Sequence, residues 1–301
     1  MAVLVLGGAG FIGSNLCKML LSDVSEVIWV DCEKSLYGKS YVLDIANYEA
    51  LKEVFLSEDI YEIYYLANTR SNDILEAYQN VSKIINVLRL AKEFEVSKII
   101  FNSSFLVYGN PYSIPVTEDE VLSPNTPFGK ALAIIEGILK DLYRTNHNFN
   151  IGILRYRITL GLNCGLDNPF LKNVIDAMNQ ELEYLDLALS KSNDQTQEFD
   201  YIHVYDVARA NIAMSQYLEK NHGLSIFNIG YGIPISLGEF IKTMEITSNR
   251  EIPYRLVKTD LDVNSFYLDT KKMDDELNFY PQRTLEDICQ DLVKTYKKWG
   301  W

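Results

Sequence analysis

The stretch Val3-Leu4-Val5-Leu6-Gly7-Gly8-Ala9-Gly10-Phe11-Ile12-Gly13-Ser14-Asn15 decides the fold. A short apolar run followed by glycines at three-residue spacing predicts a buried parallel strand, a tight turn and a helix. Gly7, Gly10 and Gly13 let the backbone turn sharply, approach a pyrophosphate closely and pack the helix on the strand. The N-terminus of that helix offers N–H groups and the positive end of its dipole to phosphates. The stretch therefore predicts a phosphate-binding turn within an α/β fold.

The next apolar run carries an acid that makes this pattern more specific. Val27-Ile28-Trp29-Val30 ends at Asp31. A glycine triplet alone also fits a structural turn, but a strand before it, a helix after it and an acid about twenty residues on favour a dinucleotide site. Asp31 is placed to accept the hydroxyls of an adenosine ribose, and its charge would repel a 2′-phosphate. The sequence therefore predicts NAD rather than NADP as cofactor.

Composition and charge limit the class of protein. The 301 residues, 48% of them hydrophobic, can bury a large core, either as one α/β domain or with a smaller second lobe. The net charge of −13 argues against nucleic acid or an anionic membrane as partner, but leaves room for an anionic small substrate. The scattered cysteines and histidines predict neither a metal site nor a disulfide framework. No apolar run reaches membrane-spanning length and the first strand leaves no room for a signal peptide, so we expect a cytoplasmic protein.

Strands and helices alternate regularly through the first half of the chain. Strands are expected over 41–45, 61–67, 98–102 and 149–155, and helices over 48–57, 73–94 and 129–145. This alternation is typical of a doubly wound parallel sheet, the Rossmann architecture, with right-handed crossovers. Asp44 could cap the helix over 48–57 or hydrogen-bond an adenine amino group, and its position leaves both interpretations open.

Beyond Gly161 the regularity fades. Helices are expected over 170–180, 206–218 and 285–299, with extended pieces over 201–204, 226–230 and 254–257. The piece over 226–230 is expected to return to the main sheet, and the rest to form a smaller C-terminal α+β lobe. We therefore expect a dinucleotide-binding domain over 1–160 and a mainly substrate-binding lobe over 161–301, with the ligand cleft between them.

Taken together, these motifs resemble those of the extended short-chain dehydrogenase/reductase family, in its nucleotide-sugar epimerase and dehydratase branch. The resemblance covers nearly the whole chain, and the motifs occur in the family's order. They are residues 6–13 for the glycine motif, Asp31 and Asp44-Ile45 for the adenosine-binding acids, Leu66-Ala67 for the strand end beneath the cofactor, Asn80-Val81 for the central asparagine, Ser103-Ser104 with Val107-Tyr108-Gly109 for the serine strand, Leu154-Arg155-Tyr156 for the strand below the nicotinamide, and Asp200-Tyr201-Ile202-His203-Val204 with Asp206-Val207-Ala208 for the late signature.

The resemblance implies NAD as cofactor and a nucleotide sugar as substrate. Ser104 would hydrogen-bond the sugar hydroxyl that is oxidised. The implied cofactor contacts are Gly7, Gly10, Phe11, Ile12, Gly13, Asp31, Asp44, Ile45, Leu66, Ala67, Asn68, Asn80 and Tyr156. A homodimer through the helices at about 78–94 and 129–145 is also implied, although Ile134 and Ile138 could simply be core residues.

The chain departs from the family at the residues that carry its chemistry. The family needs a tyrosine and a lysine at YxxxK spacing, on one helical face. The lysine lowers the tyrosine pKa from its usual value near 10, and the tyrosine takes the hydroxyl proton as hydride leaves for NAD. Over Pro127–Leu132 the tyrosine position is Phe128 and the lysine position is Leu132. Two other pairs have this spacing but do not follow the serine strand, so we interpret them as ordinary helix or surface residues: Tyr48/Lys52 and Tyr267/Lys271.

The substrate residues depart as well. The arginines that clamp a diphosphate in the family are replaced by Phe199 and, before Asp260-Leu261-Asp262, by Lys258, and its asparagine appears as Ile158. Other cations remain nearby, so an anionic ligand stays possible: Arg155, Arg157, Lys172, Arg209 and Arg255. Phe105 and Leu106 replace the dehydratase acids, which argues against 4,6-dehydration.

Two hypotheses follow from this mixture of retained and replaced motifs. The chain could be an NAD-dependent nucleotide-sugar epimerase or dehydrogenase that works without the usual tyrosine. Alternatively, it could be a catalytically silent relative that binds NAD(H) and acts as a sensor or as the partner of an active paralogue. The retained glycine turn predicts binding under either hypothesis, whereas turnover stays open.

Overall fold

The structure, a computed structural model, describes residues 1–23, 26–34, 38–165, 169–189, 197–258 and 266–297. Its main body is a seven-stranded sheet in the order β11-β6-β5-β4-β1-β2-β3, and each neighbouring pair is parallel. The strands are β1 (Ala2–Leu6), β2 (Val27–Asp31), β3 (Lys39–Val42), β4 (Ile60–Tyr65), β5 (Lys98–Ser104), β6 (Asn150–Tyr156) and β11 (Leu224–Ile229). The predicted doubly wound parallel sheet is confirmed.

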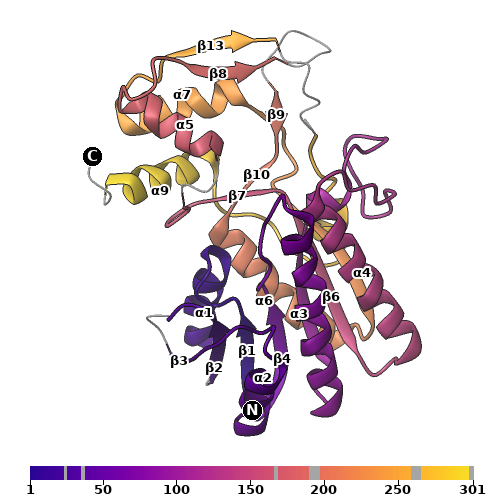
Figure 1. The fold of residues 1–301 in the computed structure, drawn as a ribbon. Coiled ribbons are helices and arrows are strands. Elements are labelled where there is room, and N and C mark those ends of the chain that lie inside the picture. Colours follow the sequence, from indigo (N-terminus) through magenta and orange to yellow (C-terminus); the bar gives the residue numbers. More distant parts are fainter. Residues whose placement is uncertain (24–25, 35–37, 166–168, 190–196, 259–265, 298–301) are drawn as a thin grey trace.

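Helices cover both faces of this sheet (Figure 1). One face packs against α2 (Tyr48–Ser57), α3 (Ile74–Glu93) and α4 (Pro127–Thr145), and the other against α1 (Phe11–Asp23) and α6 (Val204–Lys220). Successive side chains of a strand point to opposite faces, so Leu4 lies in one core and Val5 in the other. Burial on both faces explains why these strands are continuous apolar runs in the sequence.

Side-chain caps set where the helices begin. Asp73 accepts the N–H groups of Leu75 and Glu76 at the start of α3. At the start of α4, Thr126 accepts the N–H of Gly129, and a proline occupies the first helical turn. The helices expected over 48–57, 73–94 and 129–145 are confirmed.

The strand expected over 41–45 is shifted in the structure. β3 ends at Val42, its last pairing being with Asp31. Asp44 lies beyond the strand, and its side chain accepts the N–H of Ala46 at 2.9 Å. This local side-chain bond forms a turn that competes with further strand pairing.

A smaller lobe lies beyond the carboxyl ends of the strands and is drawn above the sheet in Figure 1. It contains three strand pairs, β7 (Ile158–Leu160) with β10 (Tyr201–His203), β8 (Leu185–Ala188) with β13 (Tyr254–Val257), and β9 (Glu198–Phe199) with β12 (Ile235–Ser236). Its larger helices are α5 (Pro169–Met178), α7 (Leu237–Ser248) and α9 (Leu285–Lys297), which share a third hydrophobic core. Two short helices complete the described elements, the 3₁₀ helix η1 (Phe105–Val107) and α8 (Lys271–Asp275). No helix in the described part of the chain is long and apolar enough to cross a membrane.

The second half of the chain also contributes to the sheet body. β11 pairs with β6 from Leu224↔Ile151 to Ile229↔Tyr156, so this strand returns to the edge of the sheet. α6 packs beside α1 on the face of the sheet. The last helix begins at Leu285 as expected, whereas its expected end at 299 and the segment 260–262 lie outside the described residues.

Candidate active site

The glycine turn after β1 packs tightly against the end of β4. Gly7 has φ +88°, and a Cβ there would lie 2.7 Å from the carbonyl carbon of Leu66. A Cβ at Gly13 would lie 2.0 Å from the carbonyl oxygen of Gly7. Since real Cβ atoms do not approach other atoms this closely, the turn requires glycine at both positions. It leaves an open cradle in front of the N-terminus of α1, at the carboxyl edge of the sheet.

Asp31 is tied to this turn from the end of β2. Its Oδ2 accepts the N–H of Ala9 at 2.9 Å, and its Oδ1 accepts the N–H of Glu33 at 3.3 Å. Asp31 and Asp44 line the same cavity, of about 200 Å³, which also reaches the glycine turn. The acid that the sequence singles out therefore lies beside the turn.

The structure excludes one of the two interpretations of Asp44. Helix α2 is capped by Asn47, whose side chain accepts the N–H of Ala50 at 3.2 Å. The carboxylate of Asp44 lies at the cavity, about half exposed, with the Nζ of Lys83 at 3.8 Å. The capping role is wrong, because Asn47 is the residue that reaches the first turn of the helix.

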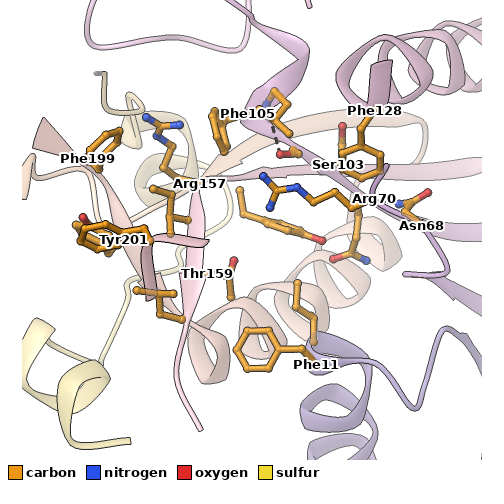
Figure 2. Close-up of a pocket in the computed structure, with 18 of the residues that line it drawn as sticks. Phe11, Asn68, Arg70, Ser103, Phe105, Phe128, Arg157, Thr159, Phe199 and Tyr201 are labelled. Atoms are coloured by element: carbon orange, nitrogen blue, oxygen red, sulfur yellow. Dashed lines mark hydrogen bonds between the residues drawn. The ribbon is translucent and has the colours of Figure 1, made fainter. Parts of the chain in front are cut away.

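A second cavity, of about 710 Å³, is lined by residues from the carboxyl edge of the sheet and from the smaller lobe. Figure 2 shows Phe11, Asn68, Phe128, Thr159 and Tyr201 around it. It shares Gly7, Gly10, Leu66 and Asn68 with the smaller cavity, so the two spaces meet at the glycine turn. A connected cleft of this kind suits an elongated ligand with a second molecule beside its far end.

The predicted site residues divide between these cavities. Gly7, Gly10, Leu66 and Asn68 line both, Asp31, Asp44, Ile45 and Ala67 line the smaller one, and Phe11, Ile12, Gly13, Ser104 and Tyr156 line the larger one. Asn80 lines neither. It is fully buried, and its side chain bonds the backbone N–H and C=O of Thr69, so it holds the loop after β4 in place.

Ser104, Phe128 and Leu132 face the larger cavity together. Ser104 ends β5, and its Oγ accepts the N–H of Leu106 at 3.3 Å, which caps the short helix η1. Phe128 and Leu132 lie one turn apart on α4, whereas Lys130 is exposed. The first turns of α4 therefore present apolar side chains to the cavity.

A buried polar network supports the floor of this site. Glu136 of α4 pairs with Arg155 of β6, with Oε2 at 2.6 Å from the Nη2 of the arginine and Oε1 at 3.0 Å from its Nε. Glu136 Oε1 also accepts the hydroxyl of Ser103 at 2.7 Å, and Arg155 donates to the hydroxyl of Tyr108 at 2.9 Å. These bonds raise the pKa of Arg155. Glu136 was not among the predicted site residues, although an acid within the apolar stripe of a helix was a usable signal.

The late signature forms structural contacts. The Nδ1 of His203 accepts the N–H of Tyr205 and caps α6, while its Nε2 lies 3.2 Å from Asp291. Burial lowers the pKa of His203, which favours the neutral ring that this cap requires. Asp206 accepts two backbone N–H groups from the segment before α9. These contacts connect α6 to α9 and to the segment before α9, and so hold the smaller lobe against α6.

Arg70 and Thr159 also line the larger cavity, although no sequence motif singled them out. Arg70 follows β4 closely, so the rule that ligands bind at the carboxyl ends of strands could have found it. Thr159 lies in β7, a short strand that the sequence pattern did not reveal. No cluster of His, Cys, Asp and Glu among the described residues could hold a metal ion.

Known proteins resemble this chain over its whole length. The family model described as "NAD dependent epimerase/dehydratase family" matches residues 3–230. The UDP-glucose 4-epimerase of Haemophilus influenzae is 30% identical, with 100% of this chain and 97% of that protein covered, and the enzyme of Bacillus subtilis is 28% identical over 100% and 96%. A UDP-glucose-4-epimerase from Stenotrophomonas maltophila with bound NAD and formylated UDP-arabinopyranose superposes with a TM-score of 0.91 at 26% identity, covering 99% of this chain and 98% of that one. The enzyme from Bifidobacterium longum in complex with NAD+ and UDP gives 0.88 at 26% identity, with the same coverage.

Proposed function

The chain belongs to the NAD-dependent epimerase/dehydratase family, and from this premise we propose that it is an NAD-dependent epimerase of a nucleotide sugar. The observation that carries the proposal is the connected cleft, which runs from the glycine turn to Ser104 and on to the smaller lobe. Relatives that superpose along the whole chain bind NAD together with UDP or a UDP-sugar, which supports the same pair of ligands here.

The glycine cradle fits the pyrophosphate of NAD, because Gly7 and Gly10 line the cavities at the N-terminus of α1, where backbone N–H groups and the helix dipole favour an anion. Asp31 would accept the adenosine ribose hydroxyls, and Asp44 and Ile45 would line the adenine end of the smaller cavity. Tyr156 and Ser104 would lie beside the nicotinamide end. Bound there, NAD would supply a hydride acceptor for a sugar carbon and return the hydride to the opposite face.

We further propose that Phe128 and Leu132 occupy the positions of the family's tyrosine and lysine. Ser104 would orient the sugar hydroxyl, but neither apolar side chain can accept its proton. Among the described residues that line the larger cavity, Asp186 is the one carboxylate. Its ion pair with Arg255 lowers its pKa, which makes it a weak base. A missing general base costs roughly 10²–10⁴-fold in rate, so we expect slow turnover.

The test restores the missing pair. In the presence of NAD and UDP-glucose, we expect Phe128→Tyr with Leu132→Lys to raise kcat by roughly 10²–10⁴-fold over the unmodified protein. Phe128→Tyr alone should gain less, because the tyrosine pKa stays high without a nearby cation. The matched control is Leu56→Lys, which makes the same leucine-to-lysine exchange at an exposed position of α2. A folded, NAD-binding double variant with no gain on a panel of nucleotide sugars would contradict the proposal.

The apolar pair also favours a second candidate function, a silent NAD(H)-binding relative. In that case the native protein releases a dinucleotide on denaturation but forms no product above the buffer rate, whereas the double variant does. Failure of the native protein to bind any dinucleotide would contradict both functions.

We also propose that the chain forms a homodimer through α3 and α4. These helices pack against each other and carry exposed apolar side chains, with Ile85 and Ile134 each 41% exposed. Ile138, in contrast, packs against the core. Exposure at Ile85 and Ile134 therefore supports an interface rather than a purely internal role for this face.

A further inference from the structure

The loop that follows β4 places Asn68 where the two cavities meet. Asn68 lines both of them, together with Gly7 and Gly10 of the glycine turn. Figure 2 shows Asn68 on the same side of the larger cavity as Phe128, away from Phe199. A ligand that extends from the smaller cavity into the larger one must therefore pass Asn68.

Hydrogen bonds hold Asn68 and its loop in place. The N–H of Asn68 donates to the carbonyl of Leu66 at 2.8 Å. The next residue, Thr69, is held through its backbone N–H and carbonyl by the side chain of Asn80. The side chain of Asn68 is held as well, since its Nδ2 donates to the backbone carbonyl of Asn102 at 3.0 Å. Because a carbonyl oxygen can only accept, this bond also determines which end of the Asn68 amide is the nitrogen.

The other end of this amide has no partner within the protein. The Oδ1 of Asn68 is buried and accepts no hydrogen bond from the described part of the chain. Buried polar atoms in proteins are nearly always hydrogen-bonded, so an unmet acceptor at this place calls for a donor. Because the side chain forms part of the wall of both cavities, a small adjustment brings Oδ1 against a ligand there. The junction of the cavities thus presents an acceptor that a ligand can satisfy.

The chemistry of NAD identifies the donor. The pyrophosphate, which we place at the glycine turn, offers only acceptors, and a carbonyl oxygen would repel it. The adenosine ribose belongs to the smaller cavity, beside Asp31. The nicotinamide ribose is the next group after the pyrophosphate along the cofactor, and its two hydroxyls are donors. The carboxamide of the nicotinamide ring also has N–H donors, but it lies at the end of the cofactor that is farthest from the glycine turn.

We propose that the Oδ1 of Asn68 accepts a hydroxyl of the nicotinamide ribose and so helps to hold the reactive half of NAD in place. On α4, Leu132 lines the larger cavity with an apolar side chain, which cannot bond to a hydroxyl. Asn68 supplies from the loop after β4 a polar contact that this part of α4 lacks. The assignment rests on the proposed placement of NAD in the two cavities and is independent of the sugar substrate.

The test uses three ligands that end at different points along the cofactor, namely ADP, ADP-ribose and NAD. ADP lacks the second ribose, whereas ADP-ribose and NAD contain it. In titration calorimetry, we expect Asn68→Ala to weaken the binding of NAD and of ADP-ribose by about 5- to 30-fold and to leave ADP binding unchanged. Ser71→Ala is the matched control, because it removes a hydrogen-bonding side chain from the same loop, lines neither cavity and should change none of the three affinities.

A second variant keeps the test decisive if Asn68→Ala fails to fold. Asn68→Asp has nearly the same shape and still presents an acceptor, so it should retain the native preference for ADP-ribose over ADP. Loss of this preference in folded Asn68→Asp, or its survival in folded Asn68→Ala, would overturn the assignment. So would an equal loss for all three ligands, which indicates a structural role, or a loss for NAD alone, which indicates a contact with the nicotinamide ring. A native protein that binds neither NAD nor ADP would instead overturn the proposed placement of the cofactor.

Discussion

Asp31 does two things with one carboxylate. It holds the glycine turn through the N–H of Ala9 and, in the proposed complex, also accepts a ribose hydroxyl. We expect Asp31→Ala to weaken NAD binding by about 10- to 100-fold, because it removes charge-assisted hydrogen bonds. NADP binding should weaken less, since the repulsion of its 2′-phosphate disappears at the same time. Calorimetric titration with both dinucleotides measures this, and an unchanged ratio of the two affinities would contradict the role of Asp31.

Glu136 is a residue whose removal should affect stability directly. It is fully buried against Arg155, so Glu136→Gln leaves an arginine charge without a full counter-charge. We expect the free energy of unfolding to fall by about 3–5 kcal/mol, measured by urea denaturation. The control is Asp141→Asn on the same helix, whose ion pair with Arg144 is exposed and should contribute nothing measurable. Equal losses in the two variants would show that burial does not govern the strength of the pair.

At the scale of elements, the glycine turn and helix α4 give a matched pair of substitutions. Gly13→Ala places a methyl group where the carbonyl of Gly7 already lies, so we expect the turn to distort and dinucleotide binding to be lost. Gly137→Ala, inside α4, meets nothing within 4 Å and should raise the free energy of unfolding by about 0.5–1 kcal/mol. Dinucleotide binding and urea denaturation of both variants check this. Normal NAD binding by Gly13→Ala would contradict the cradle.

Elements were predictable where a local pattern determines them. The helix over 48–57 has both its apolar period and its capping residue within a few positions of sequence, and the buried strands are short continuous apolar runs. The strand expected over 41–45 was misplaced because the turn at Asp44 is set by a side-chain bond that the apolar pattern does not contain. β7 was missed because three residues stabilised by pairing with a distant strand leave no period to detect.

The candidate site was likewise predictable only where its residues belong to one local sequence pattern. The glycine turn and Asp31 could be assigned from sequence, because strand, turn, helix and acid follow one another directly. The side of the larger cavity built by β7 and β10 could not, since Thr159 and Tyr201 come to one cavity only through the pairing of two strands that are distant in sequence. Glu136 and Arg155 likewise become a pair only when α4 packs on β6.

At the scale of the whole molecule, the proposed dimer is a property of the packed helices α3 and α4. We expect sedimentation to give a dimer for the native chain and a monomer for Ile85→Glu with Ile134→Glu, because a dimer interface would bury these charges. Leu56→Glu is the control, since Leu56 is 59% exposed on α2, away from this face. A monomeric native chain, or a dimeric double variant, would contradict the interface.

The position of β11 has a consequence for how the chain is made. Translation delivers β6 well before Leu224–Ile229, and only then does the sheet gain its last strand. At about 5–20 residues per second, the ribosome leaves the edge of β6 unpaired for several seconds. An unpaired apolar strand edge is a template for association with other chains. We therefore expect nascent chains to be prone to aggregation in this interval, and a gene fragment that ends at residue 160 to leave the edge of β6 unpaired permanently.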